Sequence, residues 1–144
     1  MLTSKPINFE YLRDGEDHWL TEDQLDGKKK VIKSRWQFNG KQVLYEGISY
    51  YFELDNVFEV HPYGLKLPFQ RQLILNPDGT ERVWLDLPYI TEFGDIPENS
   101  TFYGGSTWSD GRLAFRMYYG LRELLVLFDL NTGEMLNYDK KIRF

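Results

Sequence analysis

Apolar and polar residues alternate along much of the chain, and short glycine-containing turns interrupt the alternation. Within residues 34–38, Trp36 and Phe38 alternate with polar side chains, as a half-buried β-strand requires. The pair Asn39-Gly40 follows, and residues 41–45 resume the strand-like pattern. Since both turn residues tolerate a positive φ angle, this stretch predicts a tight hairpin with a two-residue loop.

Four further strand pairs are predicted, each joined by a turn that contains Gly or Asn. They are 48–54 with 57–61, 72–75 with 81–87, 102–108 with 112–119, and 124–130 with 135–139. Residues 124–128 are apolar at every position, which is typical of a central strand covered on both faces. A helix of one or two turns is predicted within residues 22–34, because Gly27 limits its length.

The composition favours an all-β protein. The chain has 144 residues, 17% of them aromatic, and its only alanine is Ala114. Because alanine is the strongest helix former and aromatic residues favour strands, we expect at most one short helix. The prediction is a single all-β domain over residues 1–144, an antiparallel meander that forms a sandwich, a partial propeller or an irregular barrel.

Residues that carry common catalytic and metal-binding chemistry are sparse. Cysteine is absent, which excludes disulfides, thiolate metal sites and cysteine nucleophiles. His18 closes an acidic turn and His61 precedes a proline, so we expect a solvated turn and a hydrogen-bonded surface histidine. Carboxylates are so numerous that chance pairs hide any glycosidase-like pair. We therefore expect no catalytic residues, no metal and no cofactor, in a protein that is not an enzyme.

The net charge of −5 resides in the middle of the chain. Residues 51–100 contain nine acidic and three basic side chains, a balance of −6. A nucleic-acid-binding surface is normally basic, so a basic protein is a better expected partner than DNA or RNA. No apolar run reaches the roughly 18 residues that span a bilayer, and residues 1–6 lack the apolar core of a signal peptide. We expect a cytoplasmic protein without membrane contact.

The predicted strand at 82–87 places a tryptophan on its outer face. Alternation turns Val83 and Leu85 inward and leaves Trp84 outward between two charged residues. A large aromatic side chain between charges is typical of an anchor in a protein interface. The alternative is that a second sheet covers this face and makes Trp84 part of the core.

An acidic loop with interleaved aromatic and aliphatic residues follows at 88–98. Charge on such a loop steers the encounter with a basic protein, while aromatic burial holds the complex together. The predicted partner-binding surface comprises Trp84, Asp86, Tyr89, Glu92, Asp95 and Glu98.

Two clusters of aromatic residues allow another function. They are Tyr45 with residues 50–52, and residues 102–103 with residues 118–119. Aromatic walls with a few polar groups can line a cavity for a small molecule or a carbohydrate. Ordinary packing between strands explains the same residues, because Tyr and Phe suit pleated surfaces.

One hairpin resembles a known repeat. Residues 126–134, Val-Leu-Phe-Asp-Leu-Asn-Thr-Gly-Glu, resemble the outer hairpin of quinoprotein-type β-propeller blades, and residues 73–81 are a looser match. The turns at Gly40, Gly79, Gly111 and Gly133 are unevenly spaced, so the chain has no fixed blade period. The resemblance implies a twisted meander or partial propeller and no cofactor.

In overall character the chain resembles the immunity proteins that bacteria pair with secreted toxins. The shared features are small size, an acidic middle section, and the absence of cysteine, an export signal and a catalytic set. This resemblance implies a non-enzymatic protein-binding module, an inhibitor that blocks a basic toxin or nuclease by occlusion. The alternative is a β-barrel or sandwich that binds a small molecule or a carbohydrate.

Overall fold

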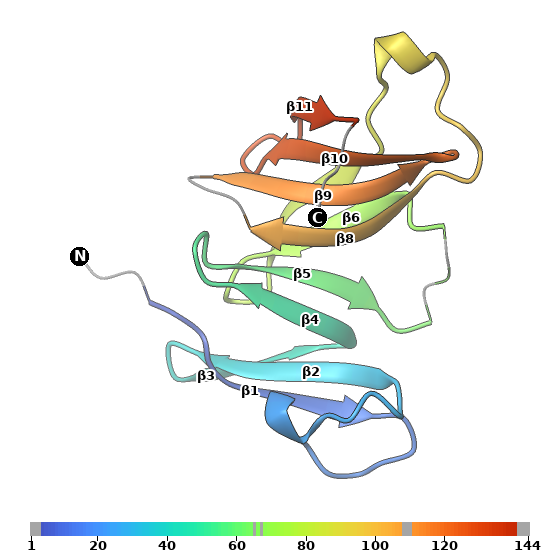
Figure 1. Ribbon diagram of the computed structural model, residues 1–144. Coiled ribbons are helices and arrows are strands. Elements are labelled where there is room, and N and C mark those ends of the chain that lie inside the picture. The colour runs from blue at the N-terminus through green and yellow to red at the C-terminus, as the bar shows by residue number, and fades with distance from the viewer. Residues whose placement is uncertain (1–3, 65, 67, 108–110, 141–144) are drawn as a thin grey trace.

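The structure is a computed structural model that describes residues 4–64, 66, 68–107 and 111–140. These residues form eleven β-strands in three antiparallel sheets (Figure 1). Within each sheet, neighbouring strands follow one another along the chain. The predicted all-β antiparallel meander is therefore confirmed, and over the described ranges no sheet closes into a barrel.

The three sheets follow one another in sequence. The N-terminal sheet contains β1 (Ile7–Arg13), β2 (Val31–Phe38) and β3 (Lys41–Tyr45). The middle sheet contains β4 (Gly47–Phe52), β5 (Val57–Pro62), β6 (Arg71–Leu75) and β7 (Glu81–Asp86). The C-terminal sheet contains β8 (Thr101–Thr107), β9 (Arg112–Tyr119), β10 (Arg122–Asp129) and β11 (Met135–Asp139). Two single-turn 3₁₀ helices, η1 (Glu22–Gln24) and η2 (Thr91–Phe93), lie between strands.

The predicted hairpins form because their turns satisfy local backbone requirements. At the β2–β3 turn, Asn39 and Gly40 have φ angles of 50° and 75°, and Phe38 pairs with Lys41. The strand pairs β4–β5, β6–β7, β8–β9 and β10–β11 also match the predicted pairs. Residues 108–110, which are the last residue of the predicted strand 102–108 and two residues of the turn after it, lie outside the described residues.

Two local predictions need correction. The helix predicted within residues 22–34 is only the single turn η1, and β2 already begins at Val31. Strand β1 has no counterpart among the predicted segments. Its alternation is broken where Asn8 adopts a φ angle of 57°, beside a shift in register between Ile7 and Glu10.

The middle sheet packs on the N-terminal sheet through one face and on the C-terminal sheet through the other. Trp36 of β2 stacks on Phe58 of β5, with ring centroids 4.0 Å apart, in the first core. Val57, the neighbour of Phe58, points the other way and packs with Phe115 and Val126 of the C-terminal sheet. Figure 1 shows the resulting order, with β4 and β5 between β2 and β8.

A buried serine joins the N-terminal and middle sheets. The Ser34 hydroxyl donates a hydrogen bond to the carbonyl oxygen of Gly47 (2.8 Å) and accepts one from the Ser49 amide (3.0 Å). Gly47 is needed at this corner, because a Cβ there would lie 2.2 Å from the carbonyl oxygen of His61. The chain can therefore turn from β3 into β4 within a single intervening residue, Glu46.

The apolar run at 124–128 is an inner strand with one partly open face. In β10, Leu124, Val126 and Phe128 are buried against the middle sheet. Leu125 and Leu127 point to the outer face of the C-terminal sheet and are only half-buried. The prediction of cover on both faces is wrong, because Leu125 and Leu127 remain partly exposed on this outer face.

Candidate protein-binding surface

All six residues of the predicted partner-binding surface are exposed. Trp84 and Asp86 lie on the edge strand β7, and the other four lie on the segment 87–100 between β7 and β8. In Figure 1 this segment, with η2 in yellow, projects beyond the C-terminal sheet at the end where β11 lies. That these residues contact a partner stays a prediction.

Trp84 is the centre of a small group of charged side chains, which we call the Trp84 cluster: Arg71, Glu81, Trp84 and Asp86. The guanidinium carbon of Arg71 lies 4.5 Å from the centroid of the Trp84 ring, in a cation–π arrangement. Arg71 Nε donates to Asp86 Oδ1 at 2.7 Å, and the indole Nε1 of Trp84 donates to Glu81 Oε2 at 3.2 Å. These contacts hold the ring at the surface, where it remains 36% exposed.

A groove of about 420 Å³ lies beside the Trp84 cluster. Trp84 and Leu73 are opposite each other on β7 and β6, and both line it. At the other end of these strands, Trp36 Nε1 donates to the carbonyl oxygen of Pro77 at 2.7 Å. The N-terminal sheet therefore contacts the turn between β6 and β7, while the end that carries Trp84 lines an open groove.

Both carboxylate oxygens of Glu92 have hydrogen-bond partners. Its carboxylate accepts a hydrogen bond from the Tyr138 hydroxyl and another from Lys140 Nζ at 2.9 Å. The Tyr138 hydrogen bond, and then Lys140, lower the pKa of Glu92, and the same hydrogen bond raises the pKa of Tyr138. Next to it, the guanidinium carbon of Arg122 lies 4.4 Å from the Phe93 ring centroid. Glu92 therefore fastens η2 to the end of β11.

The structure brings one member of the predicted surface close to the Trp84 cluster and places another elsewhere. Gln70, the residue before Arg71, donates from its side chain to the carbonyl oxygen of Glu98 at 3.4 Å. Glu98 thus borders the start of β6, whereas the contacts of Glu92 are with β11. Among the ion pairs of the described residues, neither Asp95 nor Glu98 has a partner.

The two histidines occupy different environments. His18 lies exposed in the predicted acidic turn, with ring nitrogens 3.7 Å from Glu16 and 3.5 Å from Asp17. His61 Nε2 lies 2.7 Å from Oε2 of Glu59, a buried residue that is not among the predicted site residues. Glu59 lies between Val57 and His61 in the alternating pattern of β5, which puts all three on one face of the strand. This pattern was the signal that could have pointed to Glu59. Within the described ranges, no three His, Asp or Glu side chains gather as metal ligands would.

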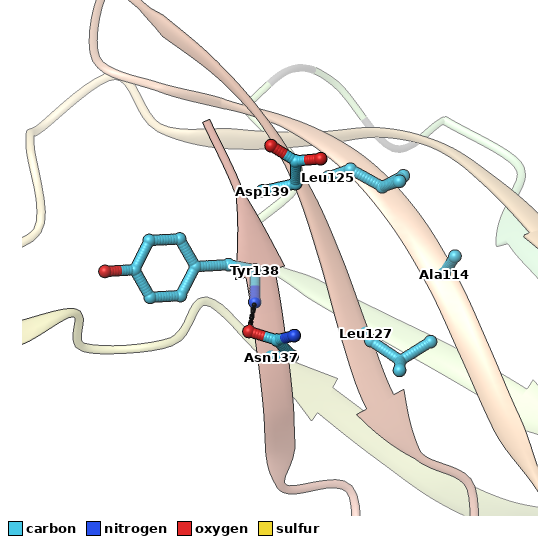
Figure 2. Close-up of a pocket in the computed structure, with 6 residues that line it drawn as sticks. All are labelled: Ala114, Leu125, Leu127, Asn137, Tyr138 and Asp139. Carbon is cyan, nitrogen blue, oxygen red and sulfur yellow. Dashed lines mark hydrogen bonds between the residues drawn. The ribbon is translucent and has the colours of Figure 1, made fainter. Parts of the chain in front are cut away.

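The outer face of the C-terminal sheet is a second exposed surface. Ala114, Leu125 and Leu127 form the apolar floor of a shallow pocket of about 150 Å³, which Asn137 and Asp139 border (Figure 2). Figure 2 shows the Tyr138 ring turned away from this floor, and its backbone N–H bonded to the side chain of Asn137. The floor of this pocket is apolar, and Asp139 is the charged residue among those that line it.

The aromatic clusters that suggested a ligand cavity do not converge. Tyr45 and Tyr51 pack in the core between the N-terminal and middle sheets. Tyr103 and Tyr118 pack on each other, with centroids 4.9 Å apart, on the C-terminal sheet. Tyr50 instead meets the His61 ring on the middle sheet. These residues therefore contribute to separate sheets rather than to one common wall.

The architecture that carries these surfaces is an all-β stack of three antiparallel sheets. One solved chain, from "Structure of Tne2 in complex with Tni2", has the same fold, with a TM-score of 0.67 and 8% sequence identity. The match covers 93% of this chain and 97% of that chain. No family model and no curated protein matches the sequence, and no comparison supports the resemblance to propeller blades.

The fold contains no membrane-spanning helix in the part of the chain that the structure describes.

Proposed function

We propose that this protein is a non-enzymatic binding module that inhibits a basic toxin or nuclease by occluding it, as immunity proteins do. The observation that carries the proposal is the fold. Over nearly its whole length the chain matches a chain whose structure was determined in a complex of two proteins, Tne2 and Tni2.

The exposed residues supply a surface suited to such a role. Trp84 offers an aromatic ring that further burial against a partner would stabilise. Asp95 and Glu98 add exposed negative charge, which speeds the encounter with a basic protein. The partner-binding surface in this proposal comprises Trp84, Asp86, Tyr89, Asp95 and Glu98, while Glu92 holds the segment that carries three of them.

The test is inhibition of a defined partner. The genes that flank this one in the source genome are expressed singly, with and without this protein, and cell growth is measured. We expect one neighbour to encode a basic protein that stops growth and is neutralised by this chain. Native mass spectrometry of the purified pair should then show a defined stoichiometric complex.

Matched variants connect the result to the surface. Trp84→Ala should weaken neutralisation, whereas Trp19→Ala should not, although Trp19 also stacks on an arginine, Arg35, at 4.1 Å. If no neighbour is toxic and native spectra show a bound small molecule instead, the inhibitor proposal is wrong. The alternative of a ligand-binding protein would then replace it.

A further inference from the structure

We infer that the groove beside Trp84 receives an arginine side chain of the partner. This inference rests on the proposed function and specifies the chemistry that the partner must present. The methylene stem of the arginine lies along the apolar wall of the groove, and its guanidinium reaches the carboxylates of the Trp84 cluster.

The groove has the shape and lining for a long side chain with an apolar stem. Its volume of about 420 Å³ exceeds that of a single side chain, so the backbone of an extended segment can enter with it. Arginine buries its stem on apolar surface while its charged end stays at a polar rim. The apolar part of the lining consists of Val60, Pro62, Pro68, Phe69, Leu73 and Trp84, and the polar part of His61, Gln70, Arg71 and Gln72.

The charges around Trp84 favour a cation over an anion. Glu81 and Asp86 contribute two carboxylates, and Arg71 contributes one guanidinium. Arg82, the other basic residue of β7, is turned toward Asn131 of the β10–β11 turn, to which it donates at 2.9 Å. The cluster therefore carries a net charge of −1. Its members Arg71 and Trp84 line the groove, and the carboxylates of Asp86 and Glu81 are hydrogen-bonded to these two residues.

Arg71 shows that this cluster already accommodates a guanidinium. It stacks at 4.5 Å from the Trp84 ring centroid and uses only one of the two Asp86 carboxylate oxygens. Oδ2 of Asp86 remains for an incoming donor, and carboxylates bind arginine through both oxygens with good geometry. Arginine is also among the residues enriched at the energetic centres of interfaces.

The test uses a short peptide as the probe and the indole N–H signals of the tryptophans as the readout. The acetylated, amidated peptide Gly-Gly-Arg-Gly-Gly is titrated into ¹⁵N-labelled protein, and the Trp84 signal is identified with Trp84→Phe. We expect a saturable shift of the Trp84 signal with a Kd of about 1–10 mM, as befits a single side chain. The Trp19 signal, from the second Arg–Trp stack, should not move.

Two control peptides, in which citrulline or norleucine replaces the arginine, separate the effect of charge from that of apolar contact. The peptide with citrulline, which has the shape of arginine without its charge, should bind at least about threefold more weakly. Asp86→Asn should weaken the binding of the arginine peptide by a similar factor. If the Trp84 signal does not shift, or if the norleucine or citrulline peptide binds equally well, the arginine inference is wrong.

The inference and the proposed function fail in different ways. Binding of the arginine peptide without any inhibited toxin would leave the groove assignment intact and remove the inhibitor proposal. An inhibited toxin whose complex leaves the Trp84 signal unshifted would instead support the inhibitor and overturn the groove assignment.

Discussion

The Tyr138 hydroxyl donates a hydrogen bond to the carboxylate of Glu92, which lies 46 residues earlier in the chain. Lys140 binds the other carboxylate oxygen at 2.9 Å. Glu92 therefore connects η2 to the end of β11, although in the sequence it is one of several acidic residues in the same loop. The acids of this segment have different roles, and charge reversal can separate them.

Reversal of Asp95 and Glu98 to lysine should slow association with a basic partner by about threefold or more. These carboxylates are exposed, and rim charges act mainly on the rate of encounter. The salt dependence of the association rate should fall as well, since salt screens such charges over about 8–10 Å. Stopped-flow or surface-based kinetics at several salt concentrations measure both effects. A change confined to the dissociation rate would contradict this role.

Glu92→Gln should loosen the segment that carries η2. The neutral amide cannot replace the charge-assisted contacts with Tyr138 and Lys140. Hydrogen exchange should become faster at amides 91–96 and stay unchanged in β9. Asp95→Gln is the matched control, because Asp95 has no ion-pair partner among the described residues. Equal exchange in both variants would show that Glu92 does not hold the segment.

Trp84→Ala should raise the dissociation rate of the partner complex by about 30-fold, or about 2 kcal/mol, if Trp84 is an interface anchor. The unfolding free energy should change little, because the ring is exposed and its contacts are at the surface. Kinetics and urea denaturation of the same samples test both statements. Trp19→Ala should leave the dissociation rate unchanged, and a similar increase in both variants would argue against a specific anchor.

Trp36→Ala should lower the free energy of unfolding by about 3–5 kcal/mol. Its side chain is 1% exposed, stacks on Phe58 at 4.0 Å and donates to the carbonyl of Pro77. The variant loses the Trp36–Phe58 stack, which joins the N-terminal and middle sheets. Urea denaturation measures the change, with the exposed Leu136→Ala as a control that should stay within about 0.5 kcal/mol. Similar losses in the two variants would contradict this packing.

Stability should fall as the pH rises from about 10 toward 12. Burial raises the pKa of Tyr11 and the pKa of Tyr45 to about 12, from 10 in the unfolded chain. Over that interval the unfolded state releases protons that the folded state retains, so unfolding becomes more favourable. Urea denaturation at several pH values measures the decline. Tyr11→Phe should make it shallower, and an unchanged pH dependence in that variant would remove Tyr11 as a cause.

Local features of the fold were predictable because short-range backbone physics determines them. At Asn39 and Gly40 the positive φ angles follow from the two residue types, and the hairpin follows from the turn. Alternation predicted that Val83 and Leu85 face inward, and both pack in the core between the middle and C-terminal sheets. Strand β1 was missed because the bulge at Asn8 breaks that same signal.

The chemistry of the candidate surface depended on residues far apart in the chain. Nothing near Glu92 indicates that Tyr138 and Lys140 bind it, and nothing near Trp84 indicates a groove formed with Val60 and Phe69. Such contacts depend on how the sheets pack, for which a single sequence has no local pattern.

The sequence by itself therefore determined the all-β class, the predicted hairpins and, within their strands, the side on which a residue lies. Only the tertiary structure decided which faces are covered. Trp36 and Trp84 both occupy alternating strands, yet the first is 1% exposed and the second 36%. The physical reason is that alternation arises within one strand, whereas burial requires another sheet. Trp36 is covered because the N-terminal and middle sheets pack together where it stacks on Phe58. The groove beside Trp84 stays open.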